Sequence, residues 1–211
     1  MMIRPIVPYV FNMNQSSILP FIIGTVLTIL MMTVIALLVA RESHEKLGED
    51  RNKLVLLFAG VGMLLSLLML CFFGFAATAI RGILFSLVLA FSSYEDIKTR
   101  ECSNYLHLMI VIAAFIGTEL SALPGMIISA AFAGGVMLIA CLFAKGKLGG
   151  ADIKFAAASA FLLGIDRAIF GLLTGTLLSI LVNIFKKNKK KGFPMIPYLA
   201  AGFMAAFFIQ I

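Results

Sequence analysis

Two aspartates, Asp96 and Asp152, stand at the ends of strongly apolar segments, and basic residues follow each of them. Only ten of the 211 residues are acidic, and an acid placed where a helix meets a bilayer is costly unless it has a role. Two carboxylates held close together cannot both ionise easily, so the pair shares one proton. The ionised member can take a proton from water while the protonated member donates to a carbonyl oxygen. Such a pair hydrolyses peptide bonds without a metal or a cofactor.

The simpler alternative is that the two aspartates are independent interfacial acids beside Lys98 and Lys154, because charges at the interface cost little. The residues before Asp152 weigh against it. Positions 149–151 are Gly-Gly-Ala, and small side chains let a backbone pass close to a substrate strand or a partner helix. The pair becomes a site only if the fold packs the third apolar segment against the sixth.

The elements that must position these acids are membrane helices. Hydrophobic residues make up 62% of the chain and the mean hydropathy is +1.08, so an integral membrane protein is predicted. The longest polar run, 41–53, is too short to bury a core of its own. Hydropathy predicts an all-α polytopic bundle with segments at about 18–40, 54–79, 82–95, 105–121, 126–144, 153–164, 168–185 and 195–211. The sixth segment is short for a full crossing.

The distribution of positive charge predicts the orientation of the bundle. With the N-terminus outside, loops 41–53, 96–104, 145–154 and 186–194 are cytoplasmic and hold 14 of the 17 Lys and Arg residues. This places both aspartates on the cytoplasmic face and the C-terminus outside. The cluster 186–191 has no interleaved aromatic residues for stacking on bases, so lipid is the expected partner rather than nucleic acid.

The three cysteines do not indicate a metal site. Cys71, Cys102 and Cys141 are far apart, without a C-x-x-C pair or neighbouring histidines. We expect neither a metal nor a cofactor, and nothing in the spacing requires a disulfide.

Two stretches together resemble the type IV prepilin peptidase family, the intramembrane aspartyl proteases with a G-x-G-D motif. In that family a first Asp precedes basic residues and, eight residues on, the Asn of an Ile-Pro-Asn; the second Asp lies in Gly-x-Gly-Asp-Val-Lys. Here Asn104 stands eight residues after Asp96, Asp152-Ile153-Lys154 matches the second stretch, and 190–197 fits a late basic and proline-containing stretch.

The resemblance implies that Asp96 and Asp152 are catalytic. It also implies substrate approach or site support from Gly149, Gly150, Ala151, Lys98, Arg100, Asn104 and Lys154. Residues 81–211 would form the six-helix catalytic core, and residues 1–80 two further transmembrane helices of unknown role. The implied activity is removal of the short basic leader of a prepilin-like protein at the cytoplasmic face of the plasma membrane.

Three departures from the family pattern narrow this prediction. Ala151 replaces the second motif glycine, as in archaeal preflagellin peptidases, and Cys102-Ser103 replaces Ile-Pro. The loop 41–53 has no cysteines and nothing corresponds to a zinc-binding methylation domain, so a stand-alone peptidase is expected, similar to those of tight-adherence pili. A catalytically altered member and a non-enzymatic membrane protein, such as a transporter or an assembly subunit, remain the alternatives.

Other polar residues are predicted to lie outside the chemistry. Glu95 points about 100° away from Asp96 on a helix and is taken as a bystander. Glu119 falls at the opposite end of its segment from the proposed site. His107 is interpreted as a packing or hydrogen-bonding residue, although histidine can titrate near neutral pH. The pattern does not indicate an oligomeric state.

Overall fold

The computed structural model describes residues 4–5, 8–12, 15–48, 50–143, 149–185 and 193–210. The basic cluster 186–191, predicted to bind lipid, therefore lies outside the described residues. The chain forms two compact units, one of Val7–Ile83 and one of Met1–Ile6 with Leu84–Ile211. Each unit is described by itself below.

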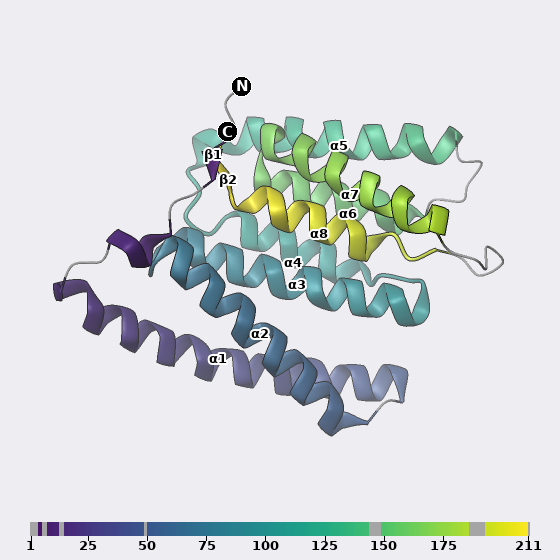
Figure 1. The fold of residues 1–211 in the computed structure, drawn as a ribbon. Helices are drawn as coiled ribbons and strands as arrows, with labels where there is room; N and C mark the ends of the chain where they lie inside the picture. The colour runs from purple at the N-terminus through teal and green to yellow at the C-terminus, as the bar shows by residue number, and fades with distance from the viewer. Residues whose placement is uncertain are drawn as a thin grey trace. The chain divides into compact units, whose positions relative to one another are not determined.

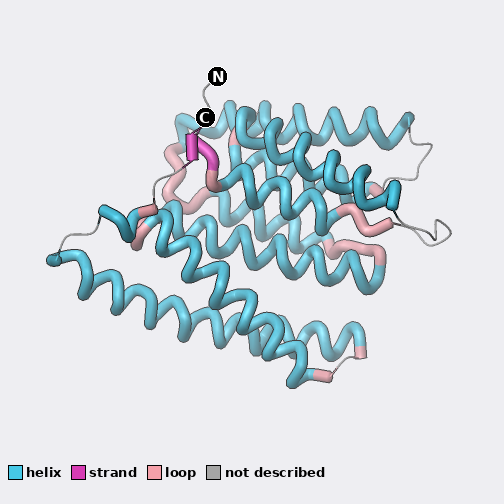
Figure 2. The backbone as a smooth tube through the Cα atoms, viewed as in Figure 1, coloured by secondary structure: helices cyan, strands magenta, loops and turns pink. Residues whose placement is uncertain are grey.

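Helices make up nearly all of the described chain, as Figures 1 and 2 show, so the predicted all-α class is confirmed. The α-helices are α1 (Gln15–Leu47), α2 (Arg51–Phe73), α3 (Ala77–Thr99), α4 (Asn104–Ala114), α5 (Leu123–Phe143), α6 (Gly150–Leu163), α7 (Ile165–Phe185) and α8 (Ile196–Phe207). Two 3₁₀ turns, η1 (Tyr9–Asn12) and η2 (Leu120–Ala122), accompany them. The strands β1 (Arg4–Pro5) and β2 (Ile209–Gln210) pair antiparallel.

The first unit contains the helical hairpin of α1 and α2. Asp50 caps α2, because its side chain accepts the Asn52 N–H at 3.0 Å. Gly74 ends α2 with a φ of 64°, a left-handed conformation that suits glycine. The predicted polar loop 41–53 is wrong in its bounds: α1 continues to Leu47, and an Arg41–Glu45 ion pair at 3.0 Å spans its last turns.

Four helices are long and apolar enough to cross a membrane, among the described residues: Asn52–Phe73, Ala77–Thr99, Leu120–Phe143 and Ile165–Phe185. The protein is therefore a membrane protein. The predicted boundary between the second and third segments is wrong, because the break falls at 74–76 rather than near residue 80. The predicted end of the third segment at residue 95 is also wrong: α3 extends to Thr99, so Asp96 lies inside its last turn instead of after its end.

The short helix α6 is the centre of the second unit. It packs against α4, α5, α7 and α8, and its buried residues run along its length from Asp152 to Leu163. Its 14 residues correspond to about 21 Å, less than the thickness of a bilayer core. Its neighbours therefore surround α6, which explains how so short a helix, with an acid in its first turn, is accommodated.

Glycines bring α7 and α8 into close contact. Gly171 and Gly175 lie one turn apart on α7 and face Gly202 on α8. A Cβ atom built on Gly202 would collide with the Gly171 carbonyl oxygen and lie 2.5 Å from the Gly175 nitrogen. Because these neighbours are backbone atoms, no side-chain rotation relieves the collision. The three glycines thus fix α8 on α7.

Candidate active site

Four helix ends meet at one end of the second unit. They are the C-terminal end of α3 and the N-terminal ends of α4, α6 and α8, and Figure 1 shows them on the same side of this unit. Two hydrogen bonds join these helix ends: the Asp96 side chain of α3 accepts from the backbone of α8, and the Lys154 side chain of α6 donates to the Asn104 side chain of α4. Both predicted catalytic aspartates lie at this junction.

Asp96 connects α3 to the start of α8. Its side chain is buried, with 6% exposed, and its Oδ2 atom accepts the Ile196 N–H at 3.1 Å. Ile196 is the first residue of α8, where backbone N–H groups lack partners within the helix and the helix dipole favours a negative charge. Arg100, one turn along, interacts with Asp96 electrostatically. The carboxylate is thus held by a helix end that lies 100 residues further along the chain.

Asp152 is held by the start of its own helix. It is the third residue of α6, with 8% of its surface exposed, and its Oδ2 atom accepts the Gly149 N–H at 3.0 Å. Gly149 in turn accepts the Asp152 N–H at 3.1 Å through its carbonyl oxygen. Asp152 and Asp96 lie close enough to interact electrostatically. The fold therefore brings the two carboxylates, from α3 and α6, into one environment.

The predicted basic and amide residues surround this pair in different ways. Lys154 donates from Nζ to the Asn104 Oδ1 atom at 2.9 Å, and this bond joins α6 to α4. Lys98 is exposed and its Nζ lies 5.6 Å from the centre of the Tyr94 ring, a cation–π contact. Arg100 adopts a φ of 64°, which is unusual for a residue with a side chain and reverses the chain after α3.

The small residues before Asp152 leave open space. A Cβ atom built on Gly150 would meet nothing within 4 Å, and one on Gly149 would have only ordinary contacts, 3.5 Å from the Asp152 Oδ2 atom. Both glycines are exposed, and Ala151 is half-buried. Among the described residues, no other helix contacts these two positions.

Glu95 is a residue whose importance the sequence did not reveal. Its side chain is buried, with 7% exposed, and accepts from the Ser103 N–H at 2.9 Å and from the Ser103 hydroxyl at 2.6 Å, so it is not the bystander that the sequence indicated. Ser103 precedes α4, so Glu95 holds the start of that helix. The only sequence signal is a hydroxyl residue eight positions after an acid, which is too common to be informative.

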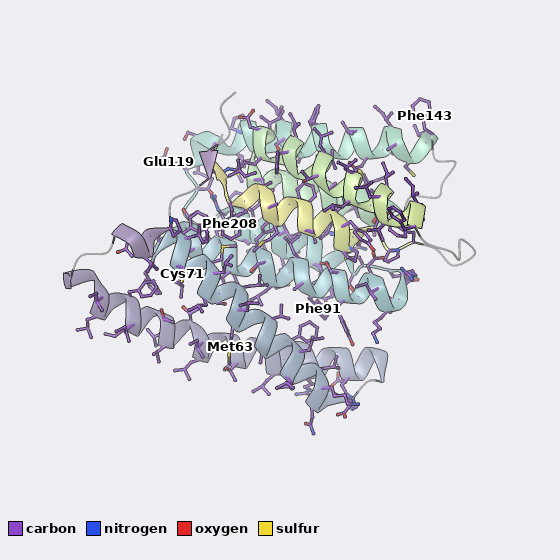
Figure 3. The ribbon with its side chains drawn as sticks, in the orientation of Figure 1. Met63, Cys71, Phe91, Glu119, Phe143 and Phe208 are labelled. Carbon is purple, nitrogen blue, oxygen red and sulfur yellow. The ribbon has the colours of Figure 1, made fainter. Side chains whose placement is uncertain are left out.

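Two other polar residues, His107 and Glu119, have no recognised part in the junction of helix ends. His107 is buried in α4, its ring 6.3 Å from that of Phe155, and neither ring nitrogen has a hydrogen-bond partner in the described part of the chain. Glu119 and Phe143 lie at opposite ends of the α5 region in Figure 3. Since α6 begins after the Phe143 end, Glu119 is remote from both aspartates.

The arrangement has a simple electrostatic logic. Glu95, Asp96 and Asp152 each accept a backbone N–H at the N-terminus of a different helix, α4, α8 and α6 respectively. Helix N-termini stabilise negative charge, and hydrogen bonds offset the cost of burying a carboxylate. Ser103 occupies both oxygens of Glu95. Asp152 accepts from the Gly149 backbone, and Asp96 accepts from the backbone of Ile196 and Met195.

Residues 83–185 match the model of the type IV leader peptidase family. This segment belongs to that family. The leader peptidase segment begins in α3 and ends with α7, and it contains both aspartates, Glu95, Ser103 and Asn104. No curated protein and no solved structure shows a significant match to the chain. The family is one of peptidases, so the match agrees with the enzyme class predicted from the sequence.

The leader peptidase match leaves out α8, although α8 supplies the Ile196 N–H to Asp96. The structure thus assigns this helix to the same junction as the matched segment. The donor is a backbone group, and no side-chain pattern in the sequence marks it.

Proposed function

We propose that the protein is an intramembrane aspartyl endopeptidase that removes the short basic leader of prepilin-like proteins. The observation that supports this most strongly is that Asp96 of α3 and Asp152 of α6 are both buried at the same junction of helix ends and interact electrostatically. Both lie within the segment that matches the leader peptidase family. Buried acids are rarely retained in membrane proteins without a role. The family match supplies the peptide bond as the substrate.

The proposed chemistry uses the two carboxyl groups and one water molecule. One carboxylate takes a proton from the water as its oxygen attacks the carbonyl carbon of the scissile bond, and the protonated carboxyl donates to the carbonyl oxygen. The tetrahedral intermediate then collapses. The carbon–nitrogen bond breaks as the leaving amine receives a proton from the carboxyl group that took it from water, and one hydroxyl of the intermediate returns its proton to the other carboxylate. The leader leaves with a new carboxyl group, and both aspartates regain their starting protonation.

The proposed geometry places the cut at the cytoplasmic boundary of the plasma membrane. The bias of positive charge toward the loops on one side supports that orientation, with both termini outside. A substrate whose apolar helix lies in the bilayer would then present the bond before that helix at the depth of the aspartates. The open space beside Gly149 and Gly150 would admit an extended backbone.

The proposal is tested by supplying the purified protein in lipid vesicles with a defined substrate. A suitable substrate is a small protein with a short lysine-rich leader followed by a 20-residue apolar helix, about the length that crosses a bilayer. We expect one cleavage, located by mass spectrometry at the polar side of the helix. A matched substrate, in which uncharged residues replace the lysines of the leader, tests whether the protein recognises the positive charge. No cleavage of either substrate or of any pilin-like protein would contradict the proposed function.

The backbone donor of α8 provides a further prediction. Ile196→Pro removes the N–H that binds Asp96. It also disfavours the αR backbone of Met195, the residue before it. A hydrogen bond to a charged group contributes about 1.5–3 kcal/mol, so we expect kcat to fall about 10–100-fold.

Ile196→Ala is the control for this prediction, because it loses the same buried side chain but keeps the N–H group. Kinetic measurement of both purified variants separates the two effects. Equal kcat values for Ile196→Pro and Ile196→Ala would show that the bond from α8 to Asp96 does not matter for cleavage.

A further inference from the structure

The turn between α3 and α4 is held by Glu95. Residues 100–103 connect the two helices, and Glu95 reaches from α3 across the turn to Ser103, just before α4 begins. Both oxygens of the carboxylate are used, one by the Ser103 N–H and one by the Ser103 hydroxyl. A buried carboxylate with two short, charge-assisted hydrogen bonds holds its partner far more tightly than a surface pair does.

Ser103 is used in an unusual way for a residue at the start of a helix. Such a serine normally turns its oxygen toward the N–H groups of its own helix. Here its side chain makes no capping bond to α4 and donates its hydroxyl hydrogen to Glu95 instead. The start of α4 is therefore tied to α3 rather than capped locally.

The Glu95–Ser103 hydrogen bonds are linked to both aspartates through adjacent residues. Asp96 follows Glu95 in the chain, so the Glu95 side chain fixes the rotation of the last turn of α3. Asn104 follows Ser103 and accepts from Lys154, which lies two residues after Asp152 in α6. A continuous path of bonds thus runs from α3 through α4 to α6.

We propose that Glu95 is a positioning residue: its bonds to Ser103 set α3 against α4 so that Asp96 faces Asp152. This inference rests on the proposed function for its effect on cleavage, but the clamp itself is a structural statement. Glu95 does not take part in proton transfer, because both of its oxygens are occupied.

The backbone at Ser103 allows the clamp to be replaced. Its φ of −65° and ψ of 135° are the values that proline adopts in an extended segment. Proline at this position would fix the turn through its ring instead of through Glu95. It would also remove the N–H and the hydroxyl, leaving the Glu95 carboxylate buried without partners, which is costly.

This gives a reciprocal rescue test. Glu95→Met keeps most of the side-chain volume and removes the acceptors, so we expect kcat to fall about 10–100-fold, since a bond to a charged group contributes about 1.5–3 kcal/mol. Ser103→Pro alone is expected to lower kcat similarly, because it leaves the buried Glu95 carboxylate without its two hydrogen-bond donors. The double variant Glu95→Met with Ser103→Pro is expected to recover at least about 10-fold over either single variant, a non-additivity typical of residues in contact.

Two control variants define what the clamp requires. Glu95→Gln retains an acceptor for the Ser103 N–H and a donor for its hydroxyl oxygen but loses the charge, so its kcat should fall less than that of Glu95→Met. Glu101→Ala removes an exposed acid from the same turn, and we expect no change.

A second measurement follows the turn independently of activity. Cys102 lies within the turn, and burial, with the nearby acids, raises the pKa of its thiol to about 12, so the reactive thiolate is scarce. With Cys71 and Cys141 replaced by alanine, maleimide labelling of Cys102 should be slow. Glu95→Met should accelerate it, and the double variant should return it toward the slow rate. Glu95→Gln corrects for the loss of negative charge beside the thiol.

The combined results separate the clamp from the proposed function. Recovery of both kcat and slow labelling in the double variant supports the clamp. Additive losses of kcat in the double variant, or full activity of Glu95→Met, would overturn the clamp. The proposed function would still stand in that case, provided that the unaltered protein cleaves the substrate. If the unaltered protein does not cleave but labelling shows the rescue, the proposed function fails and the clamp stands.

Discussion

Asp96→Asn and Asp152→Asn are each expected to reduce leader cleavage by about 10²–10⁴-fold, the range that acid–base catalysis contributes. Asparagine separates a catalytic role from a structural one, because both aspartates also accept a backbone N–H at a helix start, Asp96 at α8 and Asp152 at α6. An asparagine side-chain oxygen accepts a backbone N–H almost as well as a carboxylate does. The folded structure should therefore survive, while the exchange of a proton with water is lost.

The measurement is the initial rate of cleavage by purified variants in vesicles, together with the thermal unfolding of each. Glu119→Gln is the matched control, since Glu119 lies in the same unit, at the end opposite the aspartates (Figure 3). We expect it to cleave at the normal rate. Unimpaired cleavage by either asparagine variant would refute the acid–base pair. Loss of both folding and activity would instead assign the aspartates to helix capping.

Gly202→Leu is expected to prevent α8 from docking on α7. Even the first carbon of a side chain at Gly202 would collide with backbone atoms of Gly171 and Gly175. Overpacking costs about 1–3 kcal/mol where side chains can adjust, and the cost is greater here because backbone must move. Since α8 carries the Ile196 N–H, both thermal stability and cleavage should fall.

Gly135→Ala is the matched control for this prediction. Gly135 also lies within a helix, α5, but a Cβ atom built there would meet nothing within 4 Å. Alanine in a helix is more favourable than glycine by about 0.5–1 kcal/mol, so this variant should be as stable as the unaltered protein or more so. Equal melting temperatures for Gly202→Leu and Gly135→Ala in one detergent would contradict the proposed role of the glycine contact.

The sequence predicted the parts of the fold that depend on local composition. Apolar runs separated by charged residues predicted the helices, and the order of those runs allowed Asp96 and Asp152 to be considered together. Helix ends were predicted less well. The polar end of α1 remains helical to Leu47, and α3 continues through Asp96 to Thr99, because hydropathy does not register a helix that continues beyond its apolar part.

The contacts that build the candidate site were not predictable from local patterns. The donor to Asp96 is the backbone of Ile196, and every residue except proline carries such a donor. Glu95 binds Ser103 only because the turn with Arg100 in a left-handed conformation reverses the chain. The burial of α6 follows from four neighbouring helices, whereas its length alone indicated only that the segment is short for a full crossing of the bilayer.

The pairing of Asp96 with Asp152 is tested most directly by cross-linking cysteines at the two positions. In a chain with Cys71, Cys102 and Cys141 replaced by alanine, Asp96→Cys with Asp152→Cys is treated in native membranes with a short bifunctional thiol reagent. Asn104→Cys with Lys154→Cys is the positive control, because those side chains are in contact at 2.9 Å. Asp96→Cys with Glu119→Cys is the negative control. The account predicts intramolecular cross-linking of 96 with 152 well above the negative control; a yield no higher than in the negative control would contradict a shared catalytic site.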